Sequence, residues 1–342
     1  MDTILTKNKS NILKFIAVIL MILFHTFAFP ERIKDYQYIS IMTVNNIPIE
    51  TYIGEIGKIC VSIFVFLSGY GMYIKYKGKE KVYKSLFNKL FRFYINYWTV
   101  FIIFIPIGII MHKYNFNIKE ILLNFVGIKS TYNGEWWFVR LYVMLVLLYP
   151  LFTFIVNRLN VYIILLISFI INVLGFGITK ISIILNDNYI ILDLIGILLG
   201  AQFLFLLGMC IAKYAFFNKV TKKLNFKKSK YIILSFLILF LIFILRNVSV
   251  IGPTTELILV PMLCFFIANS VSNNNKISNL GKYSNNMWLT HSFFIYYLFP
   301  NIIFKFKYSI LILLLVIFIS MVCSFIINKI VRLELSIIKV KR

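Results

Sequence analysis

The chain of 342 residues is 61% hydrophobic and only 14% charged, whereas a soluble domain carries about a quarter charged residues. A globular interior cannot hide that much apolar surface, so the composition excludes a soluble protein and makes lipid the main solvent. The net charge of +24 would suggest nucleic-acid binding in a soluble protein, but here we expect it to mark loops at a membrane surface.

The apolar runs are continuous and about 20 residues long, which predicts membrane-spanning helices and not the alternating strands of a barrel. We predict an all-α polytopic membrane protein, a single bundle of about ten helices that takes up residues 1–342 as one domain. We expect no appended soluble domain. The predicted spans, in chain order, are 11–29, 56–74, 93–112, 135–155, 160–178, 189–212, 231–249, 255–271, 284–303 and 309–328.

The first apolar run has the basic flank of a signal peptide, but it is long and contains His25. It ends at Phe29-Pro30 without a small-residue cleavage site, so we interpret it as a retained first helix. The four cysteines all fall inside apolar spans without metal or redox spacing. We therefore interpret them as packing residues and predict no metal site.

The loop charges predict the orientation of the bundle. If the amino terminus is cytoplasmic, the cytoplasmic segments hold 24 Lys and Arg residues and the external segments hold 8. Such a bias is the positive-inside signature, and it predicts that both termini are cytoplasmic. The two richest loops run from Lys75 to Arg92 and from Lys213 to Lys230. They suit either attraction to anionic lipid or docking of a polyanionic substrate.

Ionisable side chains at membrane depth are costly and are functional candidates by default. The candidates that we place at this depth are Lys14, His25, Lys58, Arg140, Arg246, Glu256 and His291. Lys14 and His25 lie eleven residues apart on one helix, close to three turns and about 16 Å along its axis. The two side chains therefore point to nearly the same face and would line one channel. The alternatives are a lysine that reaches back to the headgroups and a histidine that hydrogen-bonds a neighbouring helix.

Four motifs, in order along the chain, resemble the membrane acyltransferase-3 family. Lys14 to His25 resembles its first helix, where an Arg and a His are separated by ten residues. The stretch 64–70 (FVFLSGY) is similar to its phenylalanine-rich Ser-Gly-Phe/Tyr motif. The stretch 136–151 begins WWFV and ends YPL, like the family's Trp-Phe-Leu opening and Pro-Leu ending. The stretch 280–291 (LGKYSNNMWLTH) resembles its Leu-Gly-Lys-x-Ser and Tyr-Leu-x-His motif.

The resemblance implies transfer of an acyl group, typically acetyl, from cytosolic acyl-coenzyme A to a carbohydrate hydroxyl at or across the membrane. A hydroxyl needs a base with a pKa near neutrality, and histidine is the side chain that supplies one. We predict that His25 is catalytic, either as that base or as a nucleophile that carries the acyl group. The sequence does not choose between these two routes.

The donor's phosphates require cations near the cytoplasmic mouth. We predict Lys14, Lys89 and Arg92 as the residues that bind acyl-coenzyme A, because basic residues at a mouth concentrate anions. Lys14 stands where the family usually has Arg, which keeps the charge but loses paired hydrogen bonding. Loop lysines also serve topology, which is the alternative for Lys89 and Arg92.

The acceptor is expected near the opposite end. Candidate substrate-binding residues are Arg140, Trp136, Trp137 and His291. Arg140 would hold an oxyanion or a sugar, or form an ion pair with the nearby Glu135. The two tryptophans suit a sugar platform or an interfacial aromatic belt. His291 would support His25 or serve as a structural hydrogen-bond donor.

The rival function is a membrane transporter or flippase for a glycan or small anion, although neither internal repeats nor paired broken helices are evident. We expect a multi-pass protein of the cytoplasmic membrane that acts in O-acetylation of a cell-envelope polysaccharide. The expected partners are the lipid bilayer, acyl-coenzyme A and a carbohydrate, and no nucleic acid. The oligomeric state is left open, a homo-oligomer included.

The charge bias makes a testable prediction about topology. Cysteines introduced at Ser40 and Glu80 should lie on opposite sides of the membrane, because the predicted orientation puts residues 30–55 outside and residues 75–92 inside. An impermeant thiol reagent applied to intact cells should label Ser40→Cys and leave Glu80→Cys unlabelled until the cells are lysed. The parent chain controls for its own cysteines, and the reverse pattern would overturn the orientation.

Overall fold

The computed structural model describes residues 3–33, 35–185, 190–246, 252–273 and 275–338. Within these ranges the regular structure is helical apart from one short antiparallel pair, β1 (Thr43–Val44) and β2 (Ile47–Pro48). The elements are α1 (Lys7–Phe27), η1 (Pro30–Arg32), α2 (Ile49–Ile56), η2 (Gly57–Ile59), α3 (Cys60–Tyr76), α4 (Val82–Ile110), α5 (Ile118–Phe125), η3 (Gly134–Trp136), α6 (Trp137–Leu147), α7 (Tyr149–Arg158), α8 (Val161–Ile184), α9 (Ile190–Lys213), α10 (Phe216–Leu224), α11 (Lys228–Arg246), α12 (Gly252–Ser270), α13 (Asn275–Leu280), α14 (Ser284–Ser292), the π-helical η4 (Phe293–Tyr297), α15 (Pro300–Phe304) and α16 (Ser309–Ile337). The all-α prediction is confirmed.

Seven helical segments in the described ranges are long and apolar enough to cross a membrane, and the bent pair α6–α7 makes eight. That pair bends by 50° within the predicted span 135–155, where Pro150 at the start of α7 has no backbone N–H to continue the ladder. The predicted span 255–271 corresponds to the shorter helix α12, and 284–303 is interrupted by η4. The chain is therefore a multi-pass membrane protein, while the count of ten remains a prediction.

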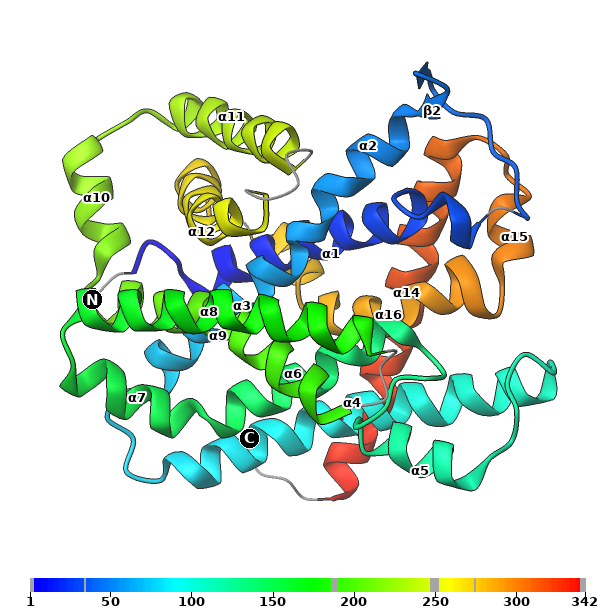
Figure 1. The fold of residues 1–342 in the computed structure, drawn as a ribbon, viewed down its shortest axis with the longest axis horizontal. Helices are drawn as coiled ribbons and strands as arrows, with labels where there is room; N and C mark the ends of the chain where they lie inside the picture. Colours follow the sequence, from blue (N-terminus) through cyan, green and yellow to red (C-terminus); the bar gives the residue numbers. More distant parts are fainter. Residues whose placement is uncertain (1–2, 34, 186–189, 247–251, 274, 339–342) are drawn as a thin grey trace.

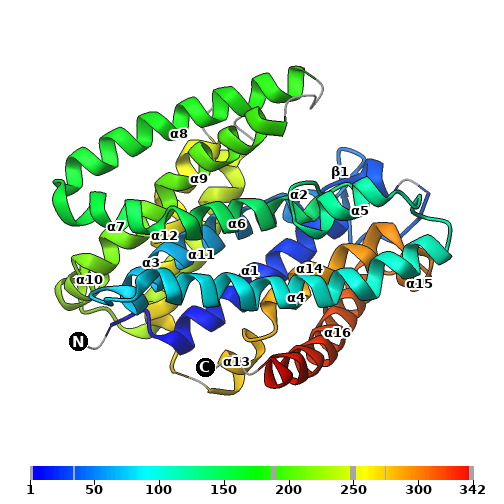
Figure 2. The ribbon, with the colours of Figure 1, turned by 90° about the horizontal axis from the view of Figure 1, so that it is seen from below.

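Helix α1 lies at the centre of the bundle in both ribbon views (Figures 1 and 2). Its Leu13 and Ile22 are fully buried, and the side chain of Thr6 caps its first turn by accepting a hydrogen bond from the Lys9 N–H. Peripheral helices show the opposite pattern: Leu166 and Ile170 on α8 are exposed. Exposed apolar stripes on long helices are what contact with lipid tails requires.

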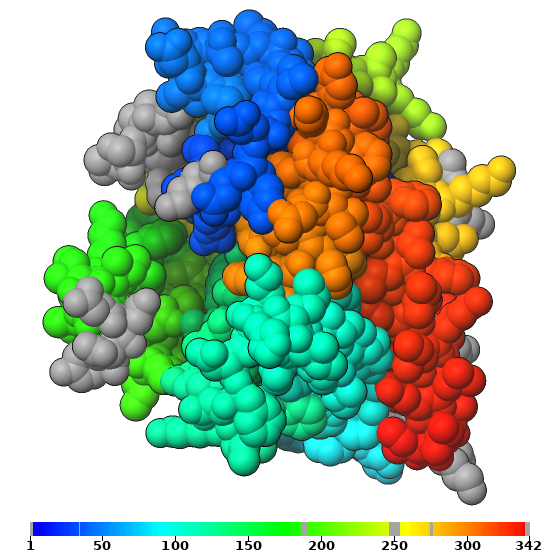
Figure 3. Space-filling view, turned by 90° about the vertical axis from the view of Figure 1, so that its right-hand side faces the viewer, coloured from blue at the N-terminus to red at the C-terminus, as the bar shows by residue number. Residues whose placement is uncertain are grey.

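Three of the segments predicted to be external gather on one face of the molecule, which Figure 3 shows. The blue segment after α1, the teal segment around α5 and the orange segment before α16 meet there. Two of them are joined directly, because the Ile39 N–H donates to the Lys307 carbonyl at 2.7 Å. This grouping is what one external side requires, while the orientation itself remains a prediction.

Close packing of α3 against α9 depends on glycine. A Cβ at Gly69 would lie 2.0 Å from the Phe205 carbonyl oxygen, and one at Gly208 would lie 2.4 Å from that of Phe66. Gly69 belongs to the motif stretch 64–70, and it serves helix packing, as small residues in membrane helices usually do. At Gly71, two residues on, a Cβ would meet nothing within 4 Å.

These two glycines form a matched pair for a stability test. Gly69→Ala should destabilise the folded protein by about 1–3 kcal/mol, because backbone atoms must move apart to admit the methyl group. Gly71→Ala should leave the melting temperature unchanged or raise it slightly, since alanine is the better helix former by about 1 kcal/mol. Thermal unfolding of both variants in detergent measures the difference. Equal melting temperatures would contradict the close approach of α3 and α9.

Candidate active site

A cavity of about 1360 Å³ follows one face of α1. The lining residues of α1 include Lys7, Lys14, Met21 and His25, which recur at helical spacing. From Lys7 to His25 the helix rises about 27 Å, close to the ~30 Å of a bilayer's hydrocarbon core. Lys14 and His25 therefore line one cavity, as their spacing in the sequence indicates.

One end of this cavity is basic. Its lining includes Lys7, Lys14, Lys75, Lys89 and Lys282, and we call this set the basic end. Lys14 lies within electrostatic range of Lys7 and Lys89, and the Lys89 ammonium lies 5.4 Å from the centre of the Tyr142 ring. Like charges held together in this way attract an anionic ligand.

Arg92, the third predicted donor-binding residue, is placed differently. The described residues that line the cavity do not include it. It is half-buried on α4 and lies within electrostatic range of Lys75. The structure therefore does not place Arg92 at the cavity wall, and its role in donor binding remains a prediction.

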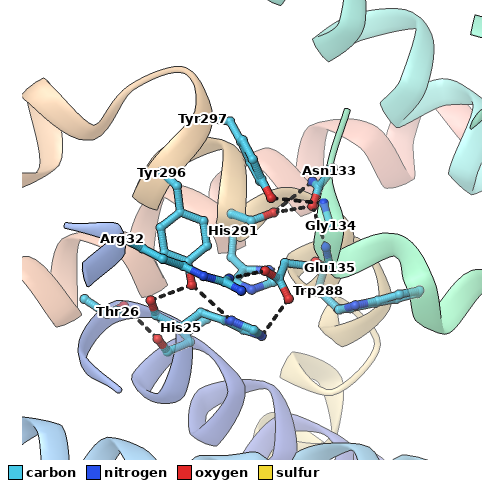
Figure 4. A network of polar contacts seen from close by, with 12 residues as sticks. His25, Thr26, Arg32, Asn133, Gly134, Glu135, Trp288, His291, Tyr296 and Tyr297 are labelled. Atoms are coloured by element: carbon cyan, nitrogen blue, oxygen red, sulfur yellow. Dashed lines mark hydrogen bonds and ion pairs between the residues drawn. The ribbon is translucent and has the colours of Figure 1, made fainter. Parts of the chain in front are cut away.

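At the other end, His25 is held by Tyr296 and Glu135 (Figure 4). The His25 Nδ1 lies 3.0 Å from the Tyr296 hydroxyl, and the same hydroxyl donates to the His25 backbone carbonyl at 2.6 Å. The Nε2 lies 3.2 Å from Oε2 of Glu135. Both ring nitrogens therefore have partners, and the imidazole is fixed in one orientation at the cavity wall.

Glu135 also contacts a cation. Its Oε1 accepts a hydrogen bond from Nη1 of Arg32 at 2.9 Å, while the guanidinium of Arg32 lies 4.3 Å from the centre of the Phe29 ring. Burial alone would lower the pKa of Arg32, but the charge interactions and hydrogen bonds with Tyr296 and Glu135 outweigh it and raise that pKa. Arg32 is therefore a permanent cation beside a buried carboxyl group.

Local sequence explains how Glu135 reaches this position. Asn133 caps η3 by accepting a hydrogen bond from the Glu135 N–H at 3.1 Å, and its side-chain amide donates to Ser292 at 2.8 Å. The Gly134 N–H donates to the Tyr297 hydroxyl at 3.0 Å. The loop that carries Glu135 is thus fastened to the segment that carries Tyr296 and Tyr297. That segment is a π-helix, an irregularity frequently found at functional sites.

His291 packs directly behind His25 and does not line the cavity. The two ring centres are 5.1 Å apart, and His291 is fully buried. Its Nδ1 lies 2.7 Å from the Trp288 carbonyl oxygen, which only an Nδ1–H can satisfy. Its Nε2 has no hydrogen-bond partner among the described residues. His291 therefore contacts the catalytic candidate and not the cavity.

The predicted ion pair of Arg140 with Glu135 is wrong. Arg140 donates from Nη2 to Asp193 at 2.6 Å and from Nη1 to the Ile128 carbonyl at 3.0 Å. Five residues along a helix rotate a side chain by about 140°, so Arg140 turns away from Glu135 and toward α9. It is absent from the described lining of the cavity.

The two tryptophans also separate. Trp136 is buried, packs against Tyr97 and Phe293, and donates to the Leu289 carbonyl at 3.0 Å. It stabilises the contact of η3 with α14. Trp137 is half-buried and lines the cavity, so of the two it is the one placed to meet a ligand.

Two further ionisable candidates, Lys58 and Glu256, also line the cavity, and Glu256 accepts a hydrogen bond from Ser62 at 3.0 Å. The side chain of Arg246 lies outside the described residues. Within the described ranges no three His, Cys, Asp or Glu side chains come together as a metal site would require. The absence of a bound metal remains a prediction.

The sequence did not single out Arg32, Glu135 and Tyr296 as partners of His25. One feature of the sequence could have identified Glu135: it is a carboxylate at the start of a predicted span, directly before a family motif. Arg32 and Tyr296 had no such feature, because an arginine in a loop and a tyrosine in an apolar span are both ordinary.

Comparison with known families gives a match over nearly the whole chain. A family model described as an acyltransferase domain, that of the acyltransferase-3 family, matches residues 8–329. Comparison with curated proteins and with solved structures gave no match. The match takes in the residues around His25 and every lysine of the basic end except Lys7. On this evidence the chain is a membrane acyltransferase that belongs to the acyltransferase-3 family.

Proposed function

We propose that the protein transfers an acyl group from acyl-coenzyme A to a hydroxyl of a cell-envelope carbohydrate, and that this acyl group is acetyl. The observation that carries this proposal is the single cavity that joins the basic end to His25. An acyl donor with an anionic head and a neutral arm matches a cavity that has the five lysines of the basic end at one end and an imidazole at the other.

The donor would bind with its phosphates at Lys14 and Lys89. Lys14 is about 16 Å from His25 along α1, so the phosphates and the thioester would occupy the two ends at once. With the orientation expected from the loop charges, the basic end opens to the cytoplasm and the His25 end lies toward the outside. The carbohydrate would then be modified at the outer side of the cytoplasmic membrane.

His25 would act as the base that activates the hydroxyl, or as the nucleophile that first accepts the acyl group. Two observations support it: its ring is fixed by Tyr296 and Glu135, and it lines the cavity. Of the predicted acceptor-binding residues, Trp137 is the one that lines the described cavity and could stack on a sugar. Arg140, Trp136 and His291 would contribute through packing and ion pairing, because none of them lines the cavity in the described residues.

The defining experiment follows labelled acetyl from acetyl-coenzyme A into envelope carbohydrate, with purified protein in detergent or liposomes. Covalent label in the carbohydrate supports transfer. Movement of an unmodified glycan across the liposome membrane without label would instead favour the transporter alternative.

The first mutational prediction concerns His25. His25→Ala should abolish acetyl transfer while the protein inserts and purifies normally, because the reaction loses its base. His291→Ala should reduce activity less or lower the melting temperature, since it acts behind His25. His112→Asn is the control, because this third histidine is exposed at the end of α4 and asparagine tolerates its positive φ of 54°. Full activity in the His25→Ala variant would contradict the proposed catalytic role of His25.

The second concerns Lys14. Lys14→Arg should keep substantial activity, because it retains the charge and adds a second hydrogen-bonding arm. Lys14→Met should lose about 2 kcal/mol of transition-state stabilisation, about thirtyfold in kcat/KM, when acyl-coenzyme A is varied. Acceptor KM should change little.

Lys84 provides the matched control, since it is exposed on α4 outside the described cavity lining. Lys84→Met should behave as the parent in donor kinetics. If Lys14→Met also kept parental donor kinetics and altered only insertion or yield, Lys14 would be an anchor for α1 and not a donor-binding residue.

A further inference from the structure

The hydrogen atoms around His25 follow from its contacts (Figure 4). A tyrosine hydroxyl has one proton to donate, and Tyr296 gives it to the His25 carbonyl at 2.6 Å. In its 3.0 Å contact with Nδ1 the hydroxyl oxygen must therefore accept. The Nδ1 of His25 carries a proton, and the reactive nitrogen is Nε2.

Nε2 faces the Oε2 of Glu135 at 3.2 Å. Two lone pairs do not face each other at that distance inside a protein, so one proton lies between them. His25 and Glu135 therefore hold a single shared proton, either as imidazolium and carboxylate or as imidazole and carboxylic acid. Such a pair titrates as a unit and not as two separate residues.

We infer that Glu135 is a second catalytic residue, the one that takes the proton from the acceptor hydroxyl while His25 supplies a proton to the leaving thiolate. This inference rests on the proposed acyl transfer. In the direct route it gives the role of base to Glu135 in place of His25, and His25 becomes the acid that protonates the leaving group. Glu135 lines the cavity beside His25, so an entering hydroxyl meets both members of the pair.

The atoms balance in a direct transfer. The hydroxyl oxygen forms a bond to the acyl carbon, the carbon–sulfur bond breaks, and the hydroxyl proton goes to Oε2 of Glu135. The Nε2 proton of His25 goes to the thiolate, which leaves as the thiol. The pair then again holds one proton, now as carboxylic acid and imidazole, and transfer of that proton from Oε2 to Nε2 across their contact restores the starting state.

The same residue serves the two-step route. Nε2 attacks the thioester after its proton has moved to Glu135, and Glu135 passes that proton to the departing thiolate. In the second step the hydroxyl attacks the acyl-imidazole, and the Glu135 carboxylate takes the hydroxyl proton. Glu135 receives the hydroxyl proton in both routes, so the assignment does not depend on which one operates.

The surroundings suit a pair that holds one proton. Arg32 from η1 donates to Oε1 at 2.9 Å and favours the carboxylate. Among the described residues, the other ionisable groups that face the pair are Tyr296 and Tyr297 from η4 and His291 from α14. Arg32 is thus a cation that balances the negative charge of the Glu135 carboxylate whenever the shared proton is not on Glu135.

The decisive experiment compares three carboxylate variants of the full-length protein. Glu135→Gln keeps a donor toward Nε2 and an acceptor toward Arg32 but cannot take a proton. It should lower kcat by about 10² to 10⁴-fold and leave the KM for acetyl-coenzyme A near that of the parent. Glu135→Asp keeps the acid–base chemistry with a shorter reach and should retain clearly more activity than the Gln variant.

Glu120→Gln is the matched control, because Glu120 also has a cation on one oxygen, Lys129 at 2.7 Å, and a hydrogen-bond donor on the other. It does not belong to the described lining of the cavity, so its kcat should equal the parent's. Melting temperatures in detergent accompany all three variants and separate catalytic loss from unfolding.

The pH profile distinguishes catalysis from a structural role. In the parent, kcat/KM should be bell-shaped, because a second proton at low pH and loss of the shared proton at high pH both inactivate the pair. Glu135→Gln should show only one limb, and Glu135→Asp should keep both. Parental kcat with a parental profile in Glu135→Gln, or equal loss in the Gln and Asp variants, would overturn the assignment. Absence of transfer by the parent would instead refute the proposed function.

Discussion

The rest of the active site depends on the position of Glu135 between His25 and Arg32. A carboxyl group this deeply buried is costly unless its charge is paired and its oxygens are hydrogen-bonded. Here one oxygen contacts Arg32 and the other contacts His25. The pairing makes burial of Glu135 tolerable, orients the imidazole, and places a proton where acyl transfer would use it.

This arrangement requires several helices to meet with little freedom. Glu135 precedes α6, His25 lies on α1, and Tyr296 lies on the π-helix after α14. The reciprocal contacts of Asn133 with Ser292 join two of these segments. In lipid, interhelical hydrogen bonds of this kind have few competing partners from solvent, so they can fix one register. The irregular backbone of η3 and η4 is tolerated because it is packed within protein or lines the cavity.

The cavity places the lysines of the basic end and the His25–Glu135 pair at opposite ends of one face of α1. Its basic end suits a soluble, anionic donor, whereas at its opposite end the buried Glu135 contacts both His25 and Arg32. A cavity of this size inside a helical bundle costs packing contacts. Ser68 and Tyr70, the neighbours of Gly69 on α3, line it, so the close approach of α3 to α9 lies beside it. The charge asymmetry of the cavity gives the donor one favourable direction of entry, whichever acceptor is used.

The sequence by itself determined that the chain lies in lipid, that it is helical, and that Lys14 and His25 share one helix face. The length of the apolar runs and the period of the helix are local properties of the chain. The sequence did not determine which polar groups meet across helices. Glu135 and Arg140 are five residues apart and were expected to pair, yet Arg140 bonds Asp193, 53 positions away. His25 bonds Tyr296, 271 positions away. Such partners are selected by the docking of helices, which orients each helix about its axis, and no local pattern encodes that rotation.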